Sequence, residues 1–91
     1  MSATVRIPTI LRPYTGGSAE VSAEGGTLAD VLDSLEASHP GIRTRVLDDD
    51  GAIRRFVNVY VNDDDVRFAE GLATAIPDGT TISIIPAVAG G

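Results

Sequence analysis

Hydrophobic and polar residues alternate in several short segments of the chain, which is the pattern of strands with one buried face. Five segments are predicted to form strands: 4–11, 20–23, 56–62, 66–68 and 81–85. In the first segment, Val5, Ile7 and Leu11 fall on the predicted inner face. Pro8 removes one backbone donor from the same segment, so that part should lie at a sheet edge or a bulge.

One stretch follows the helical period instead of the strand period. Its hydrophobic residues recur at spacings of three and four and share one helical face: Leu28, Val31, Leu32 and Leu35. Thr27 is the predicted N-cap, with Asp30 three residues later in an approximate capping box. Pro40-Gly41 should end this helix. The segment 42–47 is long enough for one further helical turn.

Glycine, proline and aspartate mark the connections between these elements. Gly16-Gly17, within the segment 13–18, predicts a hairpin turn between the first two strands. Residues 48–51 form a polar loop, and residues 71–75 a loop or a single tight turn. Pro77-Asp78-Gly79 is a strong turn signal before the last strand.

The order of elements predicts an α+β fold in which one helix covers one face of a small mixed sheet. A chain of 91 residues makes one domain. Pro86 should end the last strand, so the folded domain is expected to span residues 1–86. Residues 87–91 are then expected to form a flexible, extended C-terminal tail.

Composition removes several function classes. Cysteine is absent, which excludes disulfides, thiolate metal ligands and a cysteine nucleophile. Lysine is absent too, which excludes Schiff-base chemistry and a lysine-based P-loop. His39, the single histidine, is interpreted as a solvated or helix-capping residue. Asp48–Asp50 and Asp63–Asp65 lack the spacing of a calcium loop and are interpreted as solvated turns, so no metal site is predicted.

Net charge and hydropathy narrow the choice of partners and location. The chain carries a net charge of −6, and its seven basic residues are all arginines. This balance disfavours nucleic acid and is better suited to a basic protein partner. No apolar run is long enough to span a membrane, and the Met1 end lacks the layout of a signal peptide. The chain is therefore expected to be cytoplasmic and not membrane-bound.

The segment after Pro86 holds the candidate reactive group. It reads Ala87-Val88-Ala89-Gly90-Gly91, without charge or bulky side chains, and would reach roughly 17 Å when extended. Glycines without Cβ atoms let a partner's backbone or a nucleotide approach closely. The carboxylate of Gly91 is therefore the predicted reactive group, and residues 87–90 are the predicted partner-binding tail. A carboxylate becomes an acyl donor after adenylation by ATP, and a sulfur nucleophile can then give a thiocarboxylate.

Several stretches of the chain resemble the ubiquitin-like sulfur-carrier family that includes MoaD and ThiS. They are IPTILRP at 7–13, TGG at 15–17, FVNVYVND at 56–63, DVRF at 65–68, GLATAI at 71–76 and PAVAGG at 86–91. The resemblance covers nearly the whole chain and is weakest over 38–55. It implies a β-grasp, ubiquitin-like fold. The first segment and the Ala87-Val88-Ala89 approach are most similar to the carriers of the actinobacterial cysteine route.

The resemblance implies a carrier that acts as co-substrate of other enzymes and is not itself an enzyme. A ubiquitin-activating-type adenylyltransferase with sulfurtransferase activity would use ATP and magnesium to adenylate Gly91 and convert it to a thiocarboxylate. A PLP-dependent cysteine synthase would take the sulfur, and a zinc metalloprotease would release the cysteine. ATP, magnesium, PLP and zinc belong to those partners, so this chain is expected to bind no cofactor.

Two alternatives remain open from the sequence. The same carrier chemistry would also suit the small subunit of a molybdopterin synthase or a thiazole-pathway carrier. A protein of another class, a ubiquitin-like interaction or modifier domain, would form amide bonds through its tail or do no chemistry. In the segment 56–62, the valines are predicted to face the core, so Phe56 and Tyr60 on the other face make a possible docking patch. Arg54 and Arg55 could pair with acidic residues of a partner.

Overall fold

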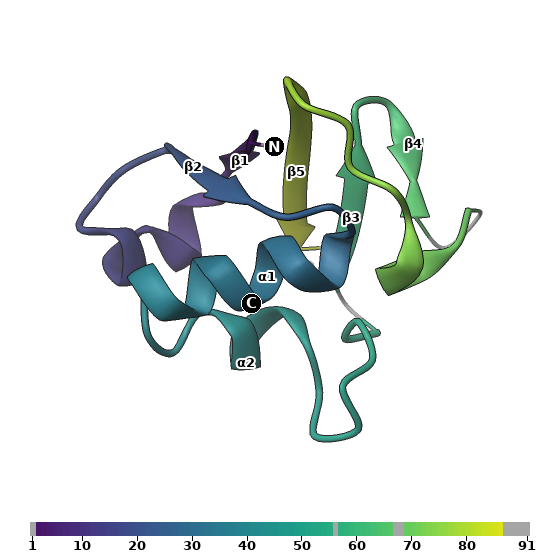
Figure 1. Ribbon diagram of the computed structural model, residues 1–91. Helices are drawn as coiled ribbons and strands as arrows, with labels where there is room; N and C mark the ends of the chain where they lie inside the picture. The colour runs from purple at the N-terminus through teal and green to yellow at the C-terminus, as the bar shows by residue number, and fades with distance from the viewer. Residues whose placement is uncertain (1, 56, 67–68, 87–91) are drawn as a thin grey trace.

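The computed structural model describes residues 2–55, 57–66 and 69–86. They form a mixed five-stranded sheet with one main helix lying across it (Figure 1). The strands are β1 (Ser2–Arg6), β2 (Glu20–Glu24), β3 (Val57–Val61), β4 (Asp64–Asp65) and β5 (Thr80–Pro86). The helices are α1 (Leu28–Ser38), α2 (Arg43–Val46) and the 3-10 helices η1 (Thr9–Thr15) and η3 (Gly71–Ala73). The α+β class predicted from the pattern is confirmed.

The last strand of the chain lies at the centre of the sheet, whose order is β2-β1-β5-β3-β4. β5 pairs with β1 in parallel and with β3 in antiparallel orientation. The two outer pairs, β1–β2 and β3–β4, are antiparallel. Because β5 has a neighbour on each side, its position and direction are fixed by two ladders of hydrogen bonds.

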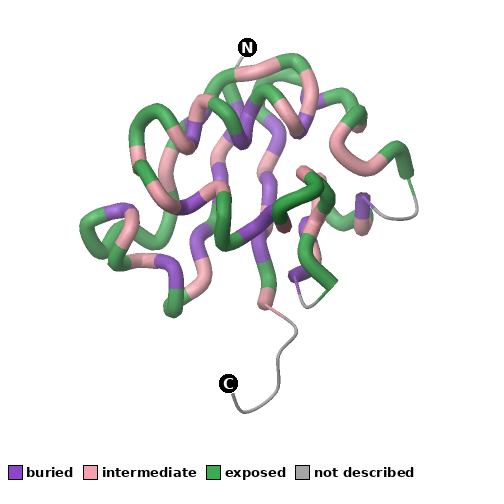
Figure 2. The backbone as a smooth tube through the Cα atoms, turned by 90° about the horizontal axis from the view of Figure 1, so that it is seen from below, coloured by how far each residue is buried: buried purple, intermediate pink, exposed green. Residues whose placement is uncertain are grey.

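The core lies between α1 and one face of the sheet. The four hydrophobic residues predicted for the inner face of the helix are buried to at least 99%. They pack in one cluster with sheet residues that include Val5, Val59 and Ile82. Buried and more exposed residues alternate along the central strands, as Figure 2 shows, so the other face of the sheet is left for polar residues.

The ends of α1 follow the sequence prediction. The Oγ1 atom of Thr27 accepts a hydrogen bond from the backbone N–H of Asp30, at 3.3 Å. At the other end His39 is the C-cap, and its N–H donates to the carbonyl of Leu35. The helical turn predicted at 42–47 is confirmed as α2, and the tight turn at 71–75 as η3.

The predicted first strand, 4–11, is wrong beyond Arg6. There the chain leaves the sheet, and Thr9–Thr15 forms the 3-10 helix η1. Pro8, which has no N–H to donate to a sheet ladder, precedes η1, and its carbonyl accepts the N–H of Leu11 at 2.9 Å. Leu11 is still buried, so its predicted inward direction is confirmed although its secondary structure is not. The hairpin between β1 and β2 therefore closes through η1 and Gly16-Gly17 instead of a short turn.

The predicted strand 66–68 is also displaced. β4 is Asp64–Asp65, and its pairing with β3 begins immediately after the two turn residues Asn62 and Asp63. Asn62 has a φ of 56°, a left-handed conformation that asparagine tolerates and that suits a two-residue hairpin turn. Val66 follows the strand as a buried core residue. Residues 67 and 68 lie outside the described residues.

The remaining strands were predicted to within a few residues. Of the three valines expected in the core from 56–62, Val57 and Val59 are buried and Val61 is half-buried. The turn at Pro77-Asp78-Gly79 is present, with the N–H of Thr80 donating to the carbonyl of Pro77 at 3.2 Å.

Candidate functional site at the end of β5

β5 brings the chain to the margin of the sheet at Pro86. Among the described residues, the last member of the buried cluster is Ile84. The proposed reactive residue Gly91 and the proposed binding tail 87–90 lie outside the described residues. The candidate site is therefore built from what surrounds Pro86, which we call the tail base.

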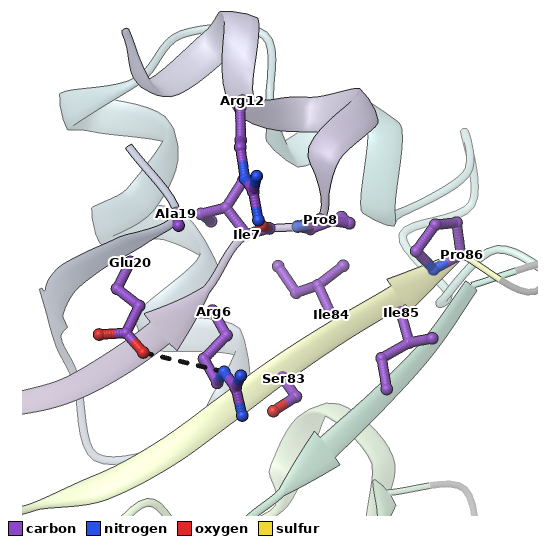
Figure 3. Close-up of a pocket in the computed structure, with 10 residues that line it drawn as sticks. All are labelled: Arg6, Ile7, Pro8, Arg12, Ala19, Glu20, Ser83, Ile84, Ile85 and Pro86. Atoms are coloured by element: carbon purple, nitrogen blue, oxygen red, sulfur yellow. Dashed lines mark hydrogen bonds and ion pairs between the residues drawn. The ribbon is translucent and has the colours of Figure 1, made fainter. Parts of the chain in front are cut away.

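Two open hollows meet at the tail base, because Pro86 lines both. The first, of about 510 Å³, lies between the ends of β1 and β5 and the start of η1 (Figure 3). In that view Arg12 extends from η1 to the Ile7 carbonyl, where its Nε donates at 3.2 Å. The second hollow, of about 460 Å³, lies on the other side of Pro86, against η1, α2 and the start of β3.

Each hollow has an exposed isoleucine on its wall. Ile85 belongs to the first hollow and is 47% exposed, and Ile10 belongs to the second and is 65% exposed. They are the exposed large hydrophobic residues of the described part of the chain. Aliphatic side chains left in water beside a chain end are suited to contact with another protein.

The walls of the hollows fit binding better than catalysis. Their described residues include no histidine, and the chain has neither cysteine nor lysine. The polar groups in the first hollow are two arginines, Glu20 and Ser83. Of these groups, the Glu20 carboxylate lies 3.8 Å from the Nε of Arg6.

Only one of the two residues of the predicted docking patch belongs to the described part of the chain. Phe56 lies outside the described residues. Tyr60 is half-buried on β3, opposite Ser83 of β5. Its ring lines a hollow with Asp63, Asp64 and Asp65, at a different place from the two hollows at Pro86.

The described residues contain no group of three or more histidine, aspartate and glutamate side chains that could hold a metal ion. The cluster Asp63–Asp65, interpreted as a solvated turn, is a turn only at Asp63, because Asp64 and Asp65 form β4. Asp48 closes its own loop, because its Oδ1 accepts the N–H groups of Asp50 and Ala52 at 2.9 and 3.1 Å. No helix in the described part of the chain is long and apolar enough to cross a membrane.

Sequence reasoning singled out Arg54 and Arg55 as possible partners of acidic residues, but it missed the two isoleucines and the other arginines of the hollows, which are Arg6, Arg12 and Arg45. The outward direction of Ile85 could be predicted from the sequence. Ile82 and Ile84 take the inward positions of the last strand, so the next residue has to face outward. Ile10 also falls on the outer face of the strand predicted at 4–11, because Val5, Ile7 and Leu11 take the inner face, although the structure places it in η1.

Comparison with known proteins identifies the class. The chain belongs to the ThiS family, which matches residues 5–91. It is 59% identical over 93 aligned positions to the sulfur carrier protein CysO of Mycobacterium tuberculosis, and the alignment covers the whole of both chains. The relatives are sulfur carriers and small modifier proteins by name, which confirms the expectation that this chain is not itself an enzyme.

Solved structures agree with this assignment and confirm the ubiquitin-like fold. The crystal structure of M. tuberculosis CysO has a TM-score of 0.91 and 58% identity, covering 94% of this chain and 99% of that one. CysO in the BexX/CysO complex of Amycolatopsis orientalis is similarly close, with a TM-score of 0.92, 50% identity and 98% and 99% coverage. The small archaeal modifier protein SAMP1 of Haloferax volcanii has a TM-score of 0.82 at 29% identity over both whole chains.

Proposed function

We propose that this protein is a sulfur carrier whose working group is the carboxylate of Gly91, and that it donates sulfur for cysteine biosynthesis. The observation that carries the proposal is the place of β5. It is the central strand, Pro86 at its end lines two hollows, and the last buried core residue of the described chain is Ile84. Residues 87–91 follow directly after this strand, where a partner could reach them. The full-length likeness to CysO supports the choice of cargo.

The chemistry needs two steps at one carbon. An oxygen of the Gly91 carboxylate attacks the α-phosphorus of ATP, pyrophosphate leaves, and an acyl adenylate forms. Sulfur at the sulfide level then attacks the carbonyl carbon, and AMP leaves with the original carboxylate oxygen. The product is a thiocarboxylate, with one oxygen of Gly91 replaced by sulfur.

Other proteins have to supply the catalysis, in line with the absence of lysine and cysteine from this chain. An adenylyltransferase of the ubiquitin-activating type would bind ATP and magnesium and transfer the sulfur. A PLP-dependent cysteine synthase would consume the thiocarboxylate, and a zinc metalloprotease would free the cysteine. The need for ATP places the proposed reaction in the cytoplasm.

The role of Gly91 is tested by Gly91→Ala in an ATP-dependent adenylation assay. A methyl group at the tip obstructs the narrow approach to the nucleotide, so we expect activation to fall at least tenfold without loss of folding. Gly26→Ala is the matched control, because a Cβ at Gly26 would meet nothing within 4 Å. Equal adenylation of the Gly91→Ala and control proteins would contradict the proposal.

The client of the sulfur is tested separately, by complementation of cysteine, molybdopterin and thiamine auxotrophs. Growth of the cysteine auxotroph alone supports the proposal. Rescue of either of the others instead would keep the carrier chemistry and reassign the client to a molybdopterin synthase or the thiazole pathway.

A second candidate is a protein modifier, favoured by the 43% identity to small archaeal modifier protein 3 of H. volcanii over 75% of this chain. A modifier forms an amide between Gly91 and an amino group of another protein. Conjugates that survive boiling and reducing agent, in the absence of a thiocarboxylate, would favour this candidate.

A further inference from the structure

The arginines of this acidic protein are gathered around the tail base. Of the six arginines among the described residues, five line the two hollows that meet at Pro86: Arg6 and Arg12 in the first, and Arg45, Arg54 and Arg55 in the second. We call these five the arginine rim. Two carboxylates, Glu20 and Asp48, line the same hollows. The local balance is therefore basic, although the net charge of the chain is −6.

Two members of the rim are oriented by neutral groups. The Nε of Arg12 donates to the carbonyl of Ile7 at 3.2 Å. The Nε of Arg45 donates to the hydroxyl of Tyr14 at 2.7 Å, and its guanidinium lies 5.5 Å from the centre of the same ring. These contacts hold the side chains in place without cancelling their charge. Each guanidinium keeps further N–H donors for a carboxylate of a partner.

The other members lie at the surface. Arg6 approaches Glu20 at 3.8 Å, but both side chains are at least 60% exposed, so water screens this pair (Figure 3). The Nε of Arg54 donates to the carbonyl of Thr44 at 2.8 Å. Arg55 is exposed on the loop before β3. Exposed charges at the edge of an interface act mainly on the rate of encounter.

Carboxylates gather at the opposite end of the sheet. β3 runs antiparallel to β5, so the turn that follows β3 lies beside the start of β5, where the N–H of Asn62 donates to the carbonyl of Thr81. That end carries Asp63, Asp64, Asp65, Asp78 and Glu24. The charged side chains of the described residues are therefore polarised along β5, with carboxylates at the start of the strand and arginines where it ends.

We propose that the arginine rim docks on a carboxylate-lined collar around the entrance of the adenylating partner's active site, with Ile10 and Ile85 filling its apolar centre. This proposal rests on the proposed function, which requires the tail to enter such a site. It differs from the expectation of a basic partner, which rested on net charge, and extends the expectation that Arg54 and Arg55 pair with acidic residues of a partner. An acidic entrance attracts the rim and repels the far end of the sheet, so the protein approaches tail first. The two isoleucines favour a protein surface over nucleic acid.

The test is the double variant Arg6→Gln/Arg45→Gln, which removes one charge from each hollow. Its kcat/KM for adenylation is measured with the activating enzyme purified from the source organism, at about 0.02 M and about 0.3 M salt, where screening differs strongly. We expect a loss of about tenfold at low salt and little difference at high salt. Arg43→Gln is the matched control, because Arg43 pairs with Asp33 at 3.0 Å and lines neither hollow. It should stay within about twofold of the wild type.

The possible outcomes separate the two proposals. The proposed function would be overturned if the activating enzyme adenylated another carrier protein but did not adenylate the wild type of this one. Adenylation of the wild type with equal low-salt rates for the double variant would overturn the docking proposal alone. Arg6→Lys/Arg45→Lys keeps the charges and should restore most of the rate. If the double variant fails to fold, Arg6→Gln alone should still lower the rate about threefold. Inhibition by added single-stranded RNA at low salt would identify a nucleic-acid surface and contradict the proposal.

Discussion

At the scale of single residues, Glu36 ties the end of α1 to the start of α2. Its carboxylate accepts the backbone N–H of Gly41 at 2.9 Å and that of Arg43 at 3.0 Å. These two hydrogen bonds, the one from Gly41 first, lower the pKa of Glu36 below the ordinary value of 4.5, and the charge of Arg43 adds to the effect. The ionised form is therefore favoured more strongly in the folded protein than in the unfolded chain.

A pH dependence of stability follows from this shift. Because the folded-state pKa is the lower one, the stabilisation is fully present above pH 4.5 and is lost as the pH falls through the folded-state value. Glu36→Gln should lower the free energy of unfolding at pH 7, and the difference from the wild type should shrink below pH 4.5. Urea unfolding at both pH values measures this. Glu24→Gln, at an exposed position on β2, is the control, and a gap for Glu36→Gln that does not change with pH would contradict the prediction.

Neighbouring glycines give a second prediction at this scale. A Cβ added at Gly25 would lie 2.6 Å from the backbone nitrogen of Val31, whereas one at Gly26 would meet nothing within 4 Å. Gly25→Ala should therefore cost about 1–3 kcal/mol in the free energy of unfolding, the usual range for forced overpacking. Gly26→Ala should be close to neutral. Equal unfolding free energies for the two variants would contradict the close contact between Gly25 and the start of α1.

At the scale of elements, α1 depends on its cap as well as on its buried face. Thr27→Ala removes the acceptor for the N–H of Asp30 and should cost about 1 kcal/mol. Thr27→Ser keeps a hydroxyl and should recover most of that loss. Thermal or chemical unfolding of the three proteins tests this. An alanine variant as stable as the wild type would rule out a contribution from the cap.

The predictability of each element follows from where its signals lie. α1 was predictable because its cap, its four inward residues and its proline-glycine end are all local in the sequence. η1 was not, because the alternating residues of 4–11 suit a strand and the 3-10 helix depends on how Leu11 packs into the core. β4 was displaced because its position depends on the left-handed conformation of Asn62, which the pattern of hydrophobic residues does not record.

At the scale of the whole molecule, one part of the candidate site could be predicted from the sequence and another part could not. The tail could be proposed from the sequence because its residues, including Gly90 and Gly91, are consecutive. Of the arginine rim, only the consecutive pair Arg54 and Arg55 could be proposed from the sequence, because the other members lie far apart in the chain and meet only when β5 takes the centre of the sheet. The net charge of −6 favoured a basic partner, whereas the proposed arginine rim favours an acidic one. Charge summed over a chain says little about the charge at one end of a fold.

The tail should contribute little to stability. The buried cluster ends at Ile84, so deletion of Gly90 and Gly91 removes no described core residue. We expect the melting temperature to change by less than about 2 °C, because a loss of 1 kcal/mol would shift it by about 4–8 °C in a domain of this size. Differential scanning calorimetry measures the shift. A drop of more than about 4 °C would mean that the end of the chain packs against the domain.

The most direct test of the carrier function is the mass of the intact protein after incubation with host lysate, ATP and a source of sulfide, with activity of the adenylating enzyme shown separately. We predict a species heavier by the replacement of one oxygen with one sulfur, and fragmentation should place that change at Gly91. The same experiment without ATP should leave the mass unchanged. An unchanged mass in the complete mixture, with the activating enzyme competent, would contradict the proposal that Gly91 carries sulfur.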